Sequence, residues 1–268
     1  MPVSIRSWPW LAAMLLAGCS ASRYEADYTK RVETYEAEAP FAFLQRNPEL
    51  VEGAASLRLP PDFAVVPKRE QRDDGAGGFV EAATDPSRLR PPFLNQFPGY
   101  KETFERRLTV DNAEYPVSVA IGVVPGDMKQ VGAIEQEILR QVGGNDAFKD
   151  GNHAWESRDV LPIAGGPAAW RVLSLSGPQG FEGVVATMVE FKTLPGRCDI
   201  WLSADPEQDR AIIIVWRLPD SLAGSLGPPV SSLGQLVART VAIPLEEPEQ
   251  AGAAEDAGDP PPGDGDGV

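Results

Sequence analysis

Two neighbouring segments, Arg197 to Ser203 and Arg210 to Leu218, predict a pair of strands that is apolar on both faces. Side chains alternate between the two faces of a strand. One face would carry Trp201, Ile212, Ile214 and Trp216, and the other Cys198, Ile200, Leu202, Ile213 and Val215. Both faces of such a pair must be covered. The chain is therefore expected to fold around this pair in three layers, with Ile213 almost completely buried.

Two amphipathic helices are predicted to supply the outer layers. Asp127 is a suitable N-cap for the first, and Gly143-Gly144 can end it in a left-handed turn. Its apolar stripe consists of Val131, Ile134, Ile138 and Val142. The second helix is predicted from Ser231 to Val241, with Leu233, Leu236 and Val237 on its apolar side. Each helix can cover the sheet.

Further strand-like runs complete a predicted antiparallel sheet. They are Lys101 to Val110, Tyr115 to Val124, Ala154 to Ile163, Ala168 to Ser176 and Phe181 to Leu194. Asp111-Asn112 predicts a tight hairpin turn between the first two runs. The glycine-rich stretch Ser176 to Gly183 is interpreted as another hairpin turn, because it lacks the ending of a phosphate-binding loop. The expected fold is α+β, an antiparallel sheet of about six or seven strands with helices packed on it, over residues 101–244.

The order of hairpin, helix, antiparallel meander and terminal helix resembles the PsbP-like α/β/α sandwich. This fold occurs in extrinsic proteins of photosystem II and in some bacterial envelope lipoproteins. The resemblance covers Lys101 to Pro244, and depends on Gly165-Gly166-Pro167-Ala168 leading into a strand and on the last meander plus helix. It implies an accessory or assembly protein, and it transfers no functional residues.

The N-terminal segment has the pattern of a signal peptide. Arg6 precedes about ten apolar residues, Trp8 to Ala17, which are too few to span a bilayer. The sequence Leu16-Ala17-Gly18-Cys19 then resembles the bacterial lipobox. This resemblance implies removal of residues 1–18 and acylation of Cys19, with palmitate among the expected acyl chains. Cleavage nearby, for instance after Ala21, with loss of Cys19, is the alternative.

The acylated Cys19 would tether the mature protein to a membrane, because two or three acyl chains hold a protein permanently. By resemblance to enterobacterial lipoproteins, Ser20 after the lipidated position favours the outer membrane, facing the periplasm. The anchor region, residues 19–39, includes a predicted helix from Ser22 to Ala37 with Tyr24, Tyr28, Val32 and Tyr35 on one face. That face would bind a partner or a membrane surface, or pack on its own domain.

Two segments outside the predicted domain have strongly biased composition. Residues 40–100 are rich in proline and glycine and are interpreted as a segment that drapes over the core. Residues 245–268 contain eight acids and no base, which predicts a disordered tail. The net charge of −15 disfavours a nucleic-acid partner.

Candidate catalytic and metal-binding residues are few. His153 is the only histidine, so zinc sites built from two or three histidines are excluded. Once Cys19 is acylated, Cys198 is the one remaining thiol, and its strand position predicts burial. Asp205, Glu207 and Asp209 alternate as in a calcium loop, but the loop lacks the glycine and closing glutamate of such sites, so a solvated turn is favoured.

Four tryptophans in predicted strands, Trp155, Trp170, Trp201 and Trp216, would serve either as core or as a stacking surface for glycans, with Trp201 the weak ligand-binding candidate. The sequence therefore predicts a non-catalytic envelope lipoprotein without a cofactor or metal, which interacts with another envelope protein. Two alternatives stay open. One is a small-molecule or glycan-binding lipoprotein, and the other is a hydrolase that uses His153.

Overall fold

The structure is a computed structural model of the 268-residue chain. It describes residues 25, 28–32, 38–52, 54–75, 77–91, 93–125, 128–146, 153–185, 191–205 and 208–243. The lipobox with Cys19, Glu207 and the acidic tail lie outside these ranges, as does most of the predicted N-terminal helix. Residues 28–32 are helical, and Tyr28 is 60% exposed.

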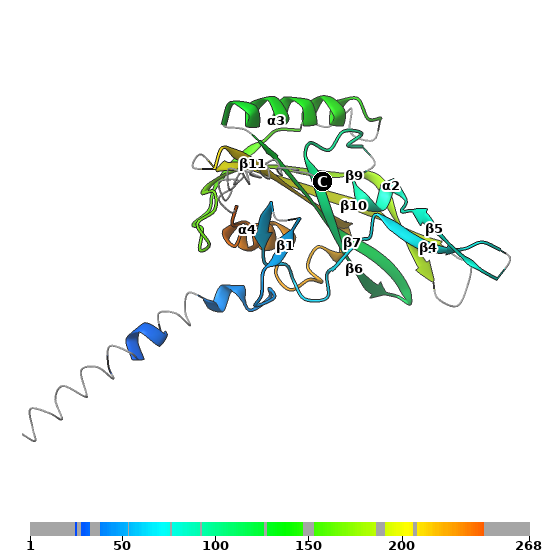
Figure 1. The fold of residues 1–268 in the computed structure, drawn as a ribbon, viewed down its shortest axis with the longest axis horizontal. Coiled ribbons are helices and arrows are strands. Elements are labelled where there is room, and N and C mark those ends of the chain that lie inside the picture. The colour runs from blue at the N-terminus through cyan, green and yellow to red at the C-terminus, as the bar shows by residue number, and fades with distance from the viewer. Residues whose placement is uncertain are drawn as a thin grey trace, which may run out of the picture.

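A seven-stranded antiparallel sheet forms the middle layer (Figure 1). Its strands run in the spatial order β3-β6-β7-β11-β10-β9-β8. Their bounds are Ala64–Val65 (β3), Tyr100–Val110 (β6), Ala113–Pro125 (β7), Glu156–Asp159 (β8), Ala169–Val185 (β9), Phe191–Asp205 (β10) and Arg210–Pro219 (β11). The α+β fold with an antiparallel sheet is therefore as predicted. The β6–β7 turn at Asp111 and Asn112 has positive φ at both residues, as the predicted tight turn requires.

The two faces of the sheet belong to separate hydrophobic cores. Helix α3 (Met128–Gly143) covers the face that carries Cys198 and Ile213. Helix α4 (Val230–Arg239) covers the face that carries Trp201 and Trp216. Figure 1 shows the two helices on opposite sides of the sheet. The predicted division of the central strands into two apolar faces is confirmed, and Ile213 is 0% exposed.

The predicted hairpin turn at Ser176 to Gly183 is wrong, because these residues lie inside β9. Their backbone pairs with β10, where the register shifts between Pro195 and Gly196. At its far end β9 also pairs with β7, through Val184 and Val185. Glycine lowers the tendency of a segment to form a strand without preventing the pairing, so residues 169–185 form one strand. The predicted run Phe181 to Leu194 is divided between β9 and β10, and residues 186–190 lie outside the described ranges.

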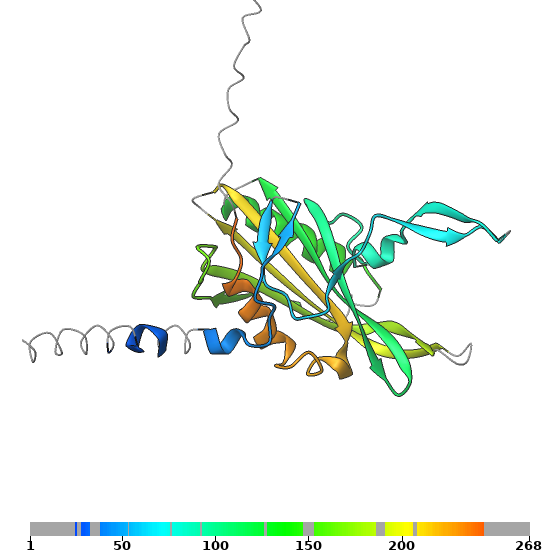
Figure 2. The same ribbon diagram turned by 60° about the horizontal axis from the view of Figure 1, so that its bottom comes forward.

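Residues 40–100 contribute more structure than their composition suggests. Strands β1 (Glu49–Val51) and β2 (Ala55–Leu57) form a hairpin that joins the α4 core through Val51 and Leu57, which are both 0% exposed. Strands β4 (Arg69–Asp73) and β5 (Phe79–Ala83) form a second hairpin, which extends away from the sheet (Figure 2). The short helix α2 (Pro86–Leu89) then leads the chain back to β6. Within the described ranges, no helix is long and apolar enough to cross a membrane.

Candidate functional site

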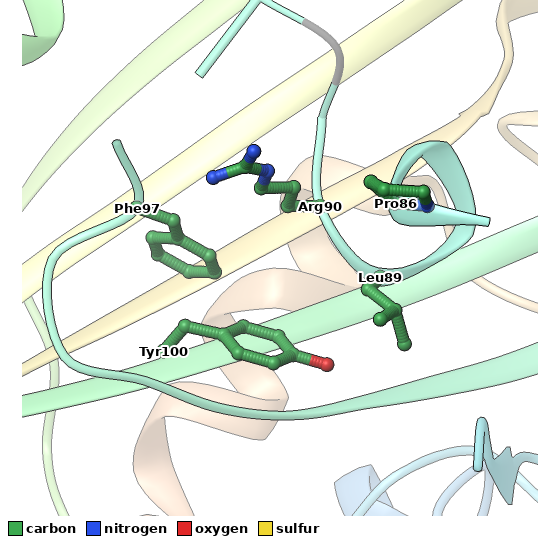
Figure 3. A pocket seen from close by; sticks show the side chains of 5 residues that line it. All are labelled: Pro86, Leu89, Arg90, Phe97 and Tyr100. Atoms are coloured by element: carbon green, nitrogen blue, oxygen red, sulfur yellow. The ribbon is translucent and has the colours of Figure 1, made fainter. Parts of the chain in front are cut away.

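A cavity of about 230 Å³ lies beside the start of β6 (Figure 3). It is lined by Pro86, Leu89, Arg90, Phe97 and Tyr100, all from residues 86–100. The Phe97 and Tyr100 rings contact each other at a centroid distance of 5.8 Å and an interplanar angle of 47°. Four of the lining side chains offer apolar surface, and the fifth is a guanidinium. The recess therefore combines an apolar interior with one positive charge.

Two arginines, Arg217 of β11 and Arg88 of α2 itself, hold the α2 wall of the cavity in place. Arg217 of β11 donates through Nη1 to the carbonyl oxygens of Ser87 (2.6 Å) and Arg90 (3.4 Å). Arg88 pairs with Glu105 of β6 (Nη2–Oε1, 3.1 Å) and with Glu70 of β4 (Nη1–Oε2, 2.8 Å). The Arg217 hydrogen bonds satisfy carbonyl groups at the end of this short helix.

The electrostatics of the two arginines differ. Burial lowers the pKa of Arg217, which donates to the neutral carbonyl oxygens of Ser87 and Arg90. The hydrogen bond to Glu105 raises the pKa of Arg88. Asp85 caps α2 by accepting from the Ser87 N–H, and this backbone hydrogen bond lowers the Asp85 pKa. The short helix α2 is therefore stabilised by the ion pairs of Arg88 and by its Asp85 cap.

The opposite wall, formed by the loop before β6, is fixed to α3 and β7. The Gln141 side chain of α3 accepts from the Gln96 N–H (3.1 Å) and donates to the Gln96 carbonyl (3.2 Å). Gly99 has φ +58°, and a Cβ there would lie 2.2 Å from the Val123 carbonyl oxygen. Only glycine permits both this backbone conformation and this close approach. The loop therefore crosses β7 in a fixed position.

A polar cluster lies at the side of the cavity, beyond the Tyr100 ring. The Tyr100 hydroxyl and Oε2 of Glu102 are buried atoms without a hydrogen-bond partner. Burial raises the pKa of both groups; the Glu52 carboxylate raises that of Glu102 further, while the Lys68 ammonium opposes this shift. Lys68 Nζ lies 2.5 Å from Glu52 Oε1, and this hydrogen bond raises the Lys68 pKa. The cluster therefore makes ionisation of Glu102 less favourable than it is in water.

Comparisons with known proteins give little. Neither a protein-family model nor a curated protein matches the sequence. The structure of the Saccharomyces cerevisiae Ran-binding protein Mog1p is similar at 15% identity and a TM-score of 0.35, over 74% of this chain and 96% of that one. A Mog1 point mutant gives 16% identity and a TM-score of 0.36, over 75% of this chain and 97% of that one. Likenesses this low support no argument about function.

The structure does not bring the sequence-derived site candidates together. His153 precedes β8 and is half-buried. Trp201 is 1% exposed, and its indole packs against Gly234 of α4, so no ring face is open to a sugar. Cys198 belongs to the α3 core, where burial raises the pKa of its thiol. Asp205 is buried at the end of β10. No group of three metal-binding side chains occurs in the described part of the chain.

The cavity residues were missed because they lie in the segment expected to drape over the core. Proline, leucine and aromatic residues spaced over 86–100 gave no periodic signal. One signal in the sequence could have predicted helix α2. The sequence Asp85-Pro86 is a typical helix start, with an N-cap acid followed by proline at the first helical position.

Proposed function

We propose that the protein is a lipid-anchored envelope protein whose α+β domain has a non-catalytic accessory or interaction role. The observation that carries this proposal is the lipobox sequence Leu16-Ala17-Gly18-Cys19 behind a short apolar segment. It places the domain on a membrane, where another envelope component is within reach. The outer membrane, on its periplasmic side, is the expected location because Ser20 follows the acylated position.

The exposed β4–β5 hairpin supports an interaction role. A two-stranded hairpin alone is marginally stable in water. This one carries Phe79, 74% exposed, and Val80, 49% exposed, near its tip. Its contacts with the remainder of the domain include the ion pair from Glu70 to Arg88. A partner that covers the two apolar side chains would stabilise the arm.

Replacement of the lipidated residue tests the anchor directly. Cys19→Ser should prevent acylation and leave unprocessed precursor or soluble protein, because the thiol is the acceptor of the acyl chains. Detergent phase partitioning and intact mass measure the outcome, with Ser22→Ala as a control that should still be acylated. A Cys19→Ser protein that stays membrane-bound and processed would contradict the lipoprotein proposal.

Crosslinking in intact cells tests the interaction role. A photoreactive residue at position 79 should capture one envelope protein from the wild-type strain, and the capture should depend on Cys19. The same residue at Leu161, equally exposed at 74%, is the matched control. Equal capture from both positions would indicate collision rather than a specific contact.

The cavity beside β6 favours a second candidate function, which is small-molecule binding. This function is compatible with the membrane anchor and does not depend on it. The chemistry of the cavity defines the class of ligand.

A further inference from the structure

Arg90 is the one charged side chain that lines the cavity, and it is left without a carboxylate partner. Its Nη1 donates to the carbonyl oxygen of Asn95 at 2.5 Å, and within the described residues it takes part in no ion pair. Its neighbour Arg88, by contrast, is bound to two glutamates. Arginine has five N–H donors, so most of those on Arg90 remain available.

The remaining walls select an apolar ligand body. Pro86 and Leu89 form one side, and the tilted pair of Phe97 and Tyr100 forms the other (Figure 3). The Tyr100 hydroxyl is buried away from solvent, so Tyr100 presents its ring to the cavity. Burial of aromatic or branched apolar surface is the main source of affinity in such a recess.

The size of the cavity limits the ligand to a fragment. Pockets for drug-sized ligands have volumes of roughly 300–1,000 Å³, and this cavity has about 230 Å³. All of its lining residues come from the single stretch 86–100, so the recess is suited to one compact molecule. A peptide would in addition need a path for its main chain on either side of the inserted residue.

The charge of the surroundings selects a monoanion. One guanidinium fork matches one carboxylate in a bidentate arrangement. A phosphate dianion would need more donors, and it would be repelled by the acidic protein around it, including Asp85 at the start of α2. The ligand head group is therefore a carboxylate.

We propose that the cavity binds a small apolar or aromatic monocarboxylate, with its apolar body between Leu89, Phe97 and Tyr100 and its carboxylate on Arg90. The site is preorganised, because Arg217, Gln141 and Gly99 fix its walls before any ligand enters. This binding site is independent of the proposed anchor and of the hairpin arm.

Saturation-transfer NMR with the full-length protein tests the site, using 3-phenylpropionate as the probe. Saturable binding is expected. The Kd should rise about tenfold or more in Arg90→Gln, as for loss of a charge-assisted hydrogen bond, while Arg69→Gln, an exposed arginine of β4, should leave it unchanged. Leu89→Phe should block binding by filling the cavity. Thermal melting of each variant confirms that it is folded.

Four probe molecules decide the outcome. The neutral 3-phenylpropanol should bind at least tenfold more weakly than 3-phenylpropionate, and benzylphosphonate should not bind better than the carboxylate. Equal binding of the alcohol, or unchanged binding in Arg90→Gln, would overturn the proposal. Binding of the peptide acetyl-Glu-Phe without binding of free 3-phenylpropionate would also overturn it, in favour of a protein-docking site. None of these results would affect the anchoring or crosslinking experiments.

Discussion

Glu102 is a carboxyl group in an unfavourable environment, because its pKa is raised by burial and by the Glu52 carboxylate. A raised pKa means that the folded state holds the proton more tightly than the unfolded chain does. Stability is therefore lost as the pH rises from the ordinary glutamate value, about 4.3, through the raised value. Below this pH window Glu102 is protonated in both the folded and the unfolded state, so it does not lower the free energy of unfolding.

Glu102→Gln should accordingly stabilise the protein at neutral pH and have a much smaller effect at a pH below 4. Urea denaturation at several pH values measures the difference. Glu137→Gln is the opposite case, because the hydrogen bond to Arg140 lowers the Glu137 pKa, and this variant should lose stability at neutral pH. A constant difference between wild type and Glu102→Gln across pH would show that the carboxyl is not perturbed.

The sequence predicted residues of the core well and residues of the cavity poorly. The alternation that separates Ile213 from Trp201 is fixed by strand geometry, and so it could be found without knowledge of the partners. The environment of Arg90 depends on which carboxylates pair with Arg88 and on where Gln141 binds the loop before β6. These are long-range contacts, which have no periodic trace in the sequence.

Helix α4 contains a glycine whose role is to admit an indole ring. A Cβ on Gly234 would lie 2.6 Å from Nε1 and 2.7 Å from Cε2 of Trp201. Trp201 is fully enclosed and also contacts Trp170, with ring centroids 6.2 Å apart, so it cannot move aside. Glycine in a helix costs about 1 kcal/mol relative to alanine. The strain of overpacking is roughly 1–3 kcal/mol, and contacts this short with an enclosed ring belong to the upper part of that range.

Gly234→Ala should therefore destabilise the protein despite its better helix propensity. Gly132→Ala in α3 is the matched control, since no atom lies within 4 Å of its added Cβ. This control should gain about 0.5–1 kcal/mol. Thermal or urea denaturation of the pair measures both effects, and a stabilised Gly234→Ala protein would mean that α4 does not pack as closely as described.

At the level of helices and strands, the sequence predicted elements whose side-chain pattern determines their structure. It failed where backbone pairing between strands overrides that pattern. The stripe of Val131, Ile134, Ile138 and Val142 predicted α3. Three of these side chains are buried, and Ile134 is half-buried. The glycines of residues 176–183 indicated a turn, but their backbone pairs with the long neighbouring strand β10. The two hairpins within 40–100 are short, and short strands carry too few residues to show alternation.

The described part of the chain is closed by contacts between residues 56–58 and residues 240–243. Ser56 of β2 and Ala242, which follows α4, exchange backbone hydrogen bonds of 2.8 and 2.9 Å. The Arg58 N–H donates to Oγ1 of Thr240 at 2.9 Å. Val241 and Ile243 are buried in the same core, at 0% and 7% exposure. Residues 240–243 thus tie the N-terminal hairpin to the sheet.

Two truncations separate this closing segment from the acidic tail. Ending the chain at Pro244 removes eight acids and no base from the sequence, and should leave the melting temperature nearly unchanged, because the tail is expected to be disordered. Ending it at Arg239 also removes Val241 and Ile243, each worth about 1.5–3 kcal/mol of burial, and should lower the melting temperature by well over ten degrees or prevent folding. Ala242→Pro, which removes the N–H that donates to Ser56 and restricts the local backbone but keeps Val241 and Ile243, should lie between the two. A loss of several degrees on truncation at Pro244 would mean that the tail packs on the domain.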